Sequence, residues 1–287
     1  MDDRALTGKQ ILITGATSGI GLAAAEALAA RGANVAIVGR SDARTKVAAA
    51  RVRTVAAPGA MVGTLVADLS SQAGVRKLAA EVLARYGKLD ILINNAGAMY
   101  TTRQLSTDGI ELTWAVNHLA PFLLTTLLLD RLKASAPSRI ITTASGAHYG
   151  ATIPFDDLNA ERSYRGFPRY KESKLANILF TSELARRLEG SNVTAHCFHP
   201  GLVATGFNRN NGLLMDVAML LLWPMSRSAE KGAETLVWLA ASPAVKTNGG
   251  YYVDMERQDP SPEGQDIRAA RRLWEISETQ LRNEARS

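Results

Sequence analysis

The sequence predicts an α/β fold in which a doubly wound parallel sheet carries helices on both faces. Short runs rich in Val, Ile and Leu alternate with longer segments of helical periodicity. The short runs show little polar alternation, as expected of strands that are buried on both faces. Such regular alternation is typical of a parallel sheet wound in two directions. Six strands are expected, within a sheet of about seven, at 10–14, 34–39, 61–67, 89–94, 139–145 and 192–199.

The predicted helices lie between these strands, and several of them end in glycine, as helices often do. They are expected at 20–32, 42–56, 71–87, 107–133 and 170–189. No linker or repeat interrupts the series, so residues 1–287 are predicted to form one domain. Its last part, 256–287, places Ile267, Ala270, Trp274, Ser277 and Leu281 on one helical stripe. The stripe predicts a docked amphipathic helix; a frayed end is the alternative.

Composition and charge exclude several classes of protein. The 287 residues carry a net charge of +6, but the basic residues are scattered and no aromatic-rich basic stripe accompanies them. Nucleic-acid binding is therefore not expected. The single cysteine, Cys197, forbids an internal disulfide and favours a cytoplasmic location. No secretory signal is recognisable, and the apolar stretch 213–225 is shorter than the roughly 20 residues of a spanning helix.

The segment TGATSGIG at 14–21 has the composition of a phosphate-binding turn. It follows a predicted strand and opens a predicted helix, which is the context that a Rossmann-type dinucleotide site requires. Gly15 allows a sharp turn, Gly19 lets backbone N–H groups approach a pyrophosphate, and Gly21 lets the helix pack closely on the strand. The sequence therefore predicts a nicotinamide dinucleotide as cofactor.

The end of the second predicted strand favours NADP(H), with NAD(H) possible. An acidic residue there would bind the ribose 2′-hydroxyl and repel a 2′-phosphate. This chain instead has Gly39 followed by Arg40, whose guanidinium can pair with phosphate. The alternative is that Arg40 is a solvated loop residue.

Tyr170 and Lys174 are four residues apart in a predicted helix, so their side chains share one face. A free phenol has a pKa of about 10 and is a poor base at neutral pH. One positive charge about 4 Å away contributes about 4 kcal/mol at an effective dielectric of 20, enough to lower that pKa to about 7. The spacing suits a tuned acid/base pair; a plain surface pair is the alternative.

These motifs together resemble the short-chain dehydrogenase/reductase family over nearly the whole chain. TGATSGIG matches its cofactor motif, NNAG at 94–97 its motif after the fourth strand, and PGLVAT at 200–205 its nicotinamide segment. The resemblance implies four catalytic residues: Asn117, Ser145, Tyr170 and Lys174. Within the family, SGAHYGATIPFDDLN and YKESKLANILFTSELARRL resemble the retinol dehydrogenase group and its bacterial relatives.

The resemblance also assigns roles to single residues. Ser145 is expected to bind the substrate oxygen, and Asn117 to hold a water that passes protons toward Lys174. Asp68 is expected to bind the adenine amino group and Asn94 to hold the central strands together. Ala96 and Gly97 are expected on the adenosine side, with Val203 and Thr205 at the carboxamide. The full cofactor set is Gly15, Thr17, Ser18, Gly19, Ile20, Gly21, Arg40, Asp68, Leu69, Asn95, Ala96, Gly97, Tyr170, Lys174, Pro200, Gly201, Val203 and Thr205.

Two positions and one spacing depart from the family pattern. Ser18 stands where many NADP-preferring members have a second basic residue, and Ala144 replaces a serine that often precedes the catalytic one. The separation of Ser145 from Tyr170 is longer than is common in the family. The retinol dehydrogenase group carries a similar insertion, so the gap supports that placement.

The remaining polar clusters do not predict a second reaction. Strand alternation sends His196 to the opposite face from Cys197 and His199, so no metal site is expected. His118 and His148 flank catalytic positions and are interpreted as packing or substrate contacts. Asp156-Asp157 is interpreted as a turn or a cap.

The sequence as a whole predicts an NADP(H)-dependent oxidoreductase that interconverts an alcohol and a carbonyl. Two alternatives remain: an epimerase or dehydratase on the same fold, and a non-catalytic NADP-binding regulator. Residues 207–226 follow the nicotinamide segment and are rich in Leu and Met. They are expected to form a substrate flap for a bulky, uncharged, lipophilic molecule. The resemblance further suggests homodimers or tetramers.

Overall fold

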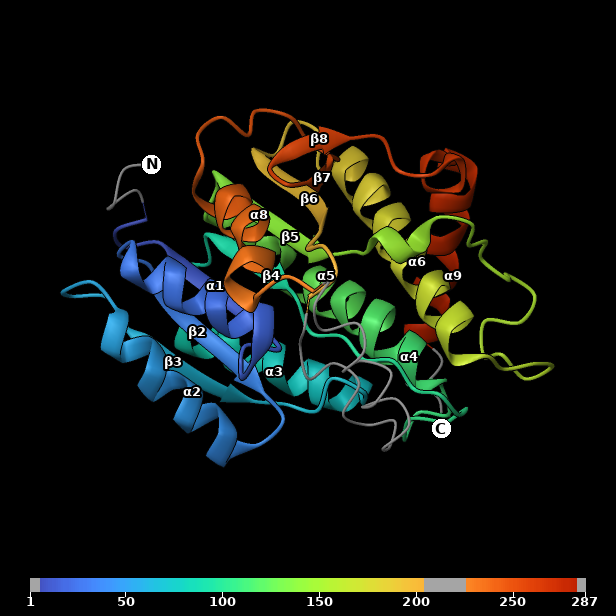
Figure 1. The fold of residues 1–287 in the computed structure, drawn as a ribbon, viewed down its shortest axis with the longest axis horizontal. Helices are drawn as coiled ribbons and strands as arrows, with labels where there is room; N and C mark the ends of the chain where they lie inside the picture. The colour runs from blue at the N-terminus through green and yellow to red at the C-terminus, as the bar shows by residue number, and fades with distance from the viewer. Residues whose placement is uncertain (1–5, 204–225, 283–287) are drawn as a thin grey trace.

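The computed structural model describes residues 6–203 and 226–282, which form an eight-stranded sheet between two layers of helices (Figure 1). The strand order is β3-β2-β1-β4-β5-β6-β7-β8, and every neighbouring pair is parallel except β7 and β8. The predicted parallel α/β fold is confirmed. The bounds are β1 (Gln10–Thr14), β2 (Asn34–Gly39), β3 (Val62–Val66), β4 (Ile91–Asn94), β5 (Ser138–Thr143), β6 (Val193–His199), β7 (Tyr251–Val253) and β8 (Glu256–Gln258).

The helices divide between the two faces of the sheet and bury a separate apolar core on each face. One face carries α1 (Gly19–Ala30), α2 (Asp42–Val55) and α8 (Ala229–Ala241). The other carries α3 (Gln72–Arg85), α5 (Ala120–Ala134), α6 (Gly166–Arg187) and α9 (Ile267–Arg282). The strands are added outward in one direction from β1 to β3 and in the other direction from β4 onward, and ligands bind beyond the strand ends at such a switch point.

Two helices begin at other residues than the sequence predicts. The helix expected from residue 107 begins only at Leu112, because a turn in which Ser106 N–H donates to Ile110 O, at 2.7 Å, precedes it. A one-turn α4 (Leu112–Trp114) and a π-helix η1 (Ala115–Leu119) then lead into α5. The helix expected from residue 170 begins at Gly166, so Tyr170 lies in its second turn. The short strands β7 and β8 went unpredicted because three residues show no periodicity.

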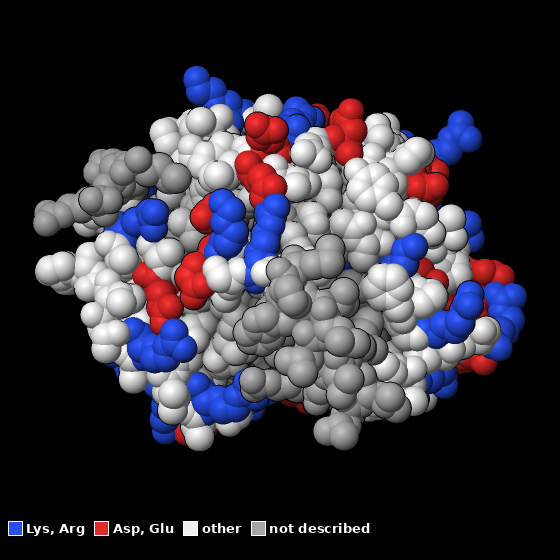
Figure 2. All heavy atoms as spheres, viewed as in Figure 1, with Lys and Arg blue, Asp and Glu red and all other residues white. Residues whose placement is uncertain are grey.

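The stretch Leu112–Ala134 is apolar enough and long enough to cross a membrane, by length and composition alone. In the fold, most of this stretch is buried. Its apolar side chains belong to the core shared with α3, α6 and α9. Packing within the protein therefore accounts for its apolar character. On the face drawn in Figure 2, basic and acidic side chains are interspersed.

The C-terminal helix α9 docks on α6, as the stripe predicted (Figure 1). Ala270, Trp274, Ser277 and Leu281 are buried. The Trp274 ring lies 4.7 Å from the ring of Phe122, between centroids. Ile267 corrects the prediction: it is the first residue of α9 and is 58% exposed, so the buried stripe begins at Ala270.

Candidate active site

The four predicted catalytic residues lie at the carboxyl ends of the central strands. Ser145 follows β5, Asn117 belongs to η1, and Tyr170 and Lys174 belong to α6. Hydrogen bonds connect Asn117 to Ser173, Ser145 to Tyr170, and Lys174 to the end of β5. Three separate elements therefore meet around one small group of side chains.

The Asn117 side chain is held on both of its polar atoms. Its Oδ1 accepts from Ala98 N at 2.8 Å, and its Nδ2 donates to Ala98 O and to Ser173 Oγ, both at 2.9 Å. Both amide hydrogens are used, so a water at Asn117 has the second lone pair of Oδ1 or the backbone carbonyl as its acceptor. The side chain ties the segment after β4 to the helix that carries Tyr170.

Ser145 contacts Tyr170 despite the long insertion between them. Its Oγ accepts from Ala147 N at 3.1 Å, which caps the 3-10 helix η2 (Gly146–His148). Its hydrogen bond to the Tyr170 phenol favours the ionised form of that phenol. The Ser145 hydroxyl therefore lies directly beside the phenol of Tyr170.

The pKa of Tyr170 differs from the predicted tuning. Burial raises the pKa of Tyr170 to about 12, and the hydrogen bond from Ser145 opposes this only in part. Burial also lowers the pKa of Lys174 to about 8. The Lys174 ammonium lies 5.6 Å from the centroid of the Tyr170 ring and donates to Thr143 O at 3.0 Å. Desolvation thus outweighs the attraction on which the prediction of a pKa near 7 depended, and Tyr170 is a protonated donor at neutral pH.

The glycine-rich turn between β1 and α1 has the shape that a pyrophosphate cradle needs. A Cβ on Gly21 would lie 2.4 Å from Gly15 O, and one on Gly15 would lie 2.8 Å from the backbone of Ala96. Gly15 and Gly19 adopt φ of 68° and 55°, a region that favours glycine. Thr17, Ser18, Gly19 and Ile20 are all partly or fully accessible to solvent. The turn therefore fits a dinucleotide, and it leaves no room for a side chain at Gly15 or Gly21.

Asn95, rather than Asn94, holds the central strands together. Asn95 Nδ2 donates to Thr14 O at 3.1 Å, and Asn95 Oδ1 accepts from Thr143 Oγ1 at 3.4 Å. This side chain therefore connects β1, β4 and β5. Asn94 points the other way and donates to Thr125 Oγ1 of α5 at 2.9 Å. Strand alternation reverses the two roles, which the NNAG motif alone does not reveal.

Ala96 and Gly97 also separate in space. Ala96 lies against Gly15 in the cradle, as its contact shows, whereas Gly97 lies beside the catalytic group. A Cβ on Gly97 would be 3.5 Å from Lys174 Nζ and 3.4 Å from Asn117 Oδ1. Gly97 is exposed, so the backbone there is accessible to a ligand next to Lys174. Ala96 thus lies in the cradle and Gly97 beside the catalytic group, and their contacts with adenosine stay predictions.

Arg40 and Asp68 lie at the ends of β2 and β3. Arg40 is exposed, and its guanidinium hydrogen-bonds the phenol of Tyr100. Asp68 Oδ1 accepts from Ser70 N at 2.9 Å and from Ser70 Oγ at 2.7 Å. Tyr100 was missed from the sequence because no motif marks it; it belongs to the segment after NNAG. Leu69 packs against the core on the α3 side.

The nicotinamide segment is described only in part. Gly201 has φ of 83° and packs under the side chain of Arg227. Val203, three residues after Pro200 in the chain, is 9% exposed and packs on Gly232 of α8. Thr205 and nearly all of the predicted flap at 207–226 lie outside the described residues.

The other polar groups that the sequence singles out lie outside the catalytic group or in the core. Asp157 Oδ1 accepts from Glu161 N at 2.8 Å, which confirms the predicted turn. His196 packs on Tyr252, and burial lowers its pKa to about 4. Burial also raises the pKa of the Cys197 thiol to about 12.

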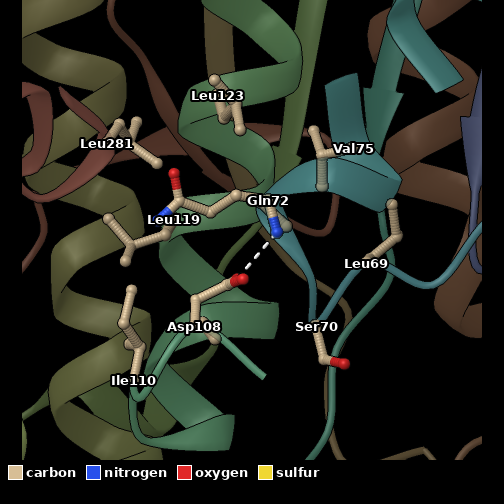
Figure 3. Close-up of a pocket in the computed structure, with 11 residues that line it drawn as sticks. Leu69, Ser70, Gln72, Val75, Asp108, Ile110, Leu119, Leu123 and Leu281 are labelled. Atoms are coloured by element: carbon tan, nitrogen blue, oxygen red, sulfur yellow. Dashed lines mark hydrogen bonds between the residues drawn. The ribbon is translucent and has the colours of Figure 1, made fainter. Parts of the chain in front are cut away.

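A small cavity beside α3 is not the active site (Figure 3). It measures about 10 Å³, and it is lined by residues such as Gln72, Leu119 and Leu281 and by none of the catalytic four. Asp108 closes one side by accepting from Gln72 N at 2.8 Å (Figure 3). A space of this size holds about one water.

Comparisons with known proteins agree with this geometry. The sequence profile of the family described as short chain dehydrogenase matches residues 9–213. Mouse retinol dehydrogenase 14 is 42% identical over 98% of this chain and 88% of its own. A Streptomyces protein named "Putative daunorubicin C-13 ketoreductase DnrU" is 41% identical over 98% and 95%. The Pseudomonas aeruginosa RhlG/NADP complex superposes with a TM-score of 0.71 and 27% identity, over 88% of this chain and 96% of that one.

Proposed function

Because the chain belongs to the short-chain dehydrogenase/reductase family and is an NAD(P)-dependent oxidoreductase acting on CH–OH groups, we propose that it uses NADP(H) to interconvert an alcohol and a carbonyl on a lipophilic substrate. The observation that carries the proposal is the contact of Ser145 with Tyr170 beside Lys174 and the glycine-rich turn. A screen of lipophilic aldehydes and ketones with NADPH, followed by identification of the products, tests it.

In the direction of reduction, residues of this chain bind the carbonyl oxygen and donate a proton to it. Tyr170 is protonated at neutral pH because burial raises its pKa to about 12, so it can donate to the carbonyl oxygen as negative charge develops there. The Ser145 hydroxyl binds the same oxygen. The ammonium of Lys174 has three donors and uses one on Thr143 O, which leaves others for a bound ribose. The cofactor, when bound, supplies the hydride.

The two alternatives from the sequence predict different uses of the cofactor. An epimerase or dehydratase would return the hydride and consume no cofactor overall. A regulator would bind NADP(H) without turnover. The preserved group of Asn117, Ser145, Tyr170 and Lys174 favours catalysis, and the retinol dehydrogenase and ketoreductase names of the relatives favour net oxidation or reduction.

The preference for NADP(H) is supported by Arg40, which is exposed at the end of β2 and oriented by Tyr100. The P. aeruginosa relative is a complex with NADP. We expect Arg40→Ala to weaken NADPH binding by about 1.5–3 kcal/mol, the worth of a charge-assisted hydrogen bond, and to leave NADH binding nearly unchanged. Titration of both cofactors into the wild type and the variant measures this. Equal affinity of the wild type for the two cofactors would contradict the preference.

A lipophilic substrate is supported by Phe167, in the first turn of α6. Its side chain is 58% exposed, and its ring stacks on Tyr170 with centroids 6.4 Å apart and planes 27° apart. An exposed aromatic ring next to the proton donor provides an apolar wall for the substrate.

We expect Phe167→Ala to raise KM for a bulky aromatic ketone roughly two- to tenfold, since an aromatic contact contributes about 0.5–1.5 kcal/mol. Steady-state kinetics with a bulky and a small carbonyl measure the change, and the small carbonyl should be little affected. Val47→Ala on α2, where Val47 is 65% exposed, is the matched control. Equal effects of both substitutions would reject the assignment of Phe167 to the substrate site.

A cytoplasmic location and a homo-oligomeric state stay predictions. The location is supported by a single buried cysteine in the sequence. The oligomeric state is supported by the family alone.

A further inference from the structure

Two histidines connect the catalytic elements to the C-terminal segment 259–282. His148 closes η2, directly after Ser145, and its ring is fully buried. Its Nδ1 lies 2.7 Å from Ser145 O, and its Nε2 lies 3.0 Å from Ser261 N. One imidazole therefore spans the backbone of the catalytic serine and a loop that lies more than one hundred residues later in the chain.

The partners of His148 fix its tautomer. The Ser261 backbone N–H can only donate, so Nε2 must be the acceptor and must lack a proton. The proton of the neutral ring is then on Nδ1, which donates to Ser145 O. Ser261 is itself buried, and its Oγ accepts from Gly264 N at 3.3 Å, within η5 (Pro262–Gln265). The loop that positions the ring is thus ordered by its own hydrogen bonds.

His118 makes an equivalent link from the neighbour of Asn117. Its Nε2 lies 2.9 Å from Ser277 Oγ of α9, and the Ser277 hydroxyl donates its hydrogen to Leu273 O at 2.7 Å. His118 Nε2 must therefore carry a proton and donate. Asn117 is thus followed directly by a histidine that binds the C-terminal segment. Ser145 is followed by a short helix whose last residue is a second such histidine.

We infer that the C-terminal segment is part of the scaffold of the active site, and that His148 is a positioning residue that sets the backbone of Ser145 through Ser261. The inference rests on the proposed function, in which Ser145 binds the substrate oxygen. A displacement of about 1 Å in a catalytic group can cost about a hundredfold in rate.

The link is sensitive to acid. Protonation of His148 would place an N–H of the ring against the Ser261 N–H, so the two donors would face each other. Burial lowers the pKa of His148, while the Ser145 carbonyl and the charge of Glu263 act in the opposite direction. His199 of β6 faces the ring as a second titratable group, and the rings of Tyr149 and Tyr251 flank it. The neutral ring is favoured in the fold, so the link is complete above pH 6.5 and is lost as the pH falls through the lowered pKa.

Two conservative variants separate the two hydrogen bonds. His148→Asn keeps a donor near the position of Nδ1 and loses the acceptor for Ser261. His148→Gln keeps an acceptor near the position of Nε2 and loses the donor to Ser145. We expect kcat of His148→Gln to fall at least tenfold, with the Kd for NADPH within twofold of wild type. The kcat of His148→Asn should lie between those of the wild type and His148→Gln, and it should lack the decline that the wild type shows as the pH falls through the lowered pKa of His148.

Equal kcat in the two variants would overturn the inference, as would a loss of kcat matched by an equal loss of NADPH binding in His148→Gln. Hydrogen exchange of the Ala147 and Ser261 amides gives a readout that needs no turnover. The Ser261 amide should exchange faster in His148→Asn, and the Ala147 amide, which Ser145 Oγ binds, faster in His148→Gln. Unchanged exchange at both amides would also overturn it. If the wild type reduces no carbonyl at all, the proposed function fails while this exchange pattern still reports on the link.

Discussion

Tyr170→Phe should lower kcat for carbonyl reduction by a factor of about 10²–10⁴, the usual worth of a general acid. The phenol is hydrogen-bonded to Ser145 and lies beside Lys174, so it is placed to donate the proton. The substitution keeps the ring and its stacking on Phe167, so NADPH binding and thermal stability should stay close to wild type. Steady-state kinetics together with a cofactor titration measure both expectations.

Tyr149→Phe provides the matched control for this substitution. Tyr149 is half-exposed next to His148, and its hydroxyl donates to Asp259 O at 3.3 Å, so the change also removes one phenolic oxygen near the site. It should leave kcat within a factor of about three, because a bond of this kind contributes little. A Tyr170→Phe protein that turns over as well as Tyr149→Phe would remove Tyr170 from the mechanism.

Arg169→Met should lower the free energy of unfolding by about 3–5 kcal/mol, because it leaves a buried carboxylate without its partner. Arg169 Nε donates to Glu111 Oε2 at 2.8 Å, and both side chains are at most 1% exposed. Arg169 also binds Glu172 and Leu158 O, and its guanidinium lies 4.6 Å from the centroid of the Trp114 ring. Urea denaturation of the variant measures the loss.

The reason for so large an effect is the position of Glu111. Its carboxylate caps the start of α4, accepting from Thr113 N at 2.8 Å and from Trp114 N at 2.9 Å. Arg169 precedes Tyr170 directly, so this ion pair joins the element that leads to Asn117 with the helix that carries the proton donor. Both activity and stability should therefore decline in Arg169→Met.

Two further variants check the electrostatic origin of that loss. Adding Glu111→Gln to Arg169→Met removes the unpaired charge, so the double variant should be more stable than Arg169→Met alone. Arg162→Met breaks an ion pair with Asp156 in which both side chains are mostly exposed, and should change stability little. If Arg169→Met is no more destabilising than Arg162→Met, the buried ion pair of Arg169 and Glu111 does not stabilise the fold as its burial predicts.

The parts of the molecule that the sequence predicted well are those whose structure is set by residues close together in the chain. The strands β1, β2 and β6 match their predicted ranges to within one residue, because buried parallel strands are continuous apolar runs with clear ends. The glycine-rich turn was predicted with its neighbours, because only glycine fits at Gly15 and Gly21. The contact of Ser145 with Tyr170 followed from the family motif, despite the insertion between them.

Other parts depend on side chains far apart in sequence, and no local period encodes them. The pair of Glu111 and Arg169, the link from His148 to Ser261, and the contact of Arg40 with Tyr100 all belong to this group. The pKa of Tyr170 was predicted in the wrong direction, because the sequence gives the position of the neighbouring charge but not the degree of burial. Desolvation depends on the whole fold.

The ratio of NADPH consumed to alcohol formed tests the central claim most directly. A purified sample is mixed with an excess of a bulky lipophilic ketone and a limiting amount of NADPH, and both the cofactor and the product are quantified at completion. The account predicts one alcohol for each NADPH oxidised, and no product in the absence of cofactor. A ketone converted to an isomer or a dehydrated product with the NADPH intact, or NADPH that is bound but never consumed with any carbonyl of the screen, would contradict it.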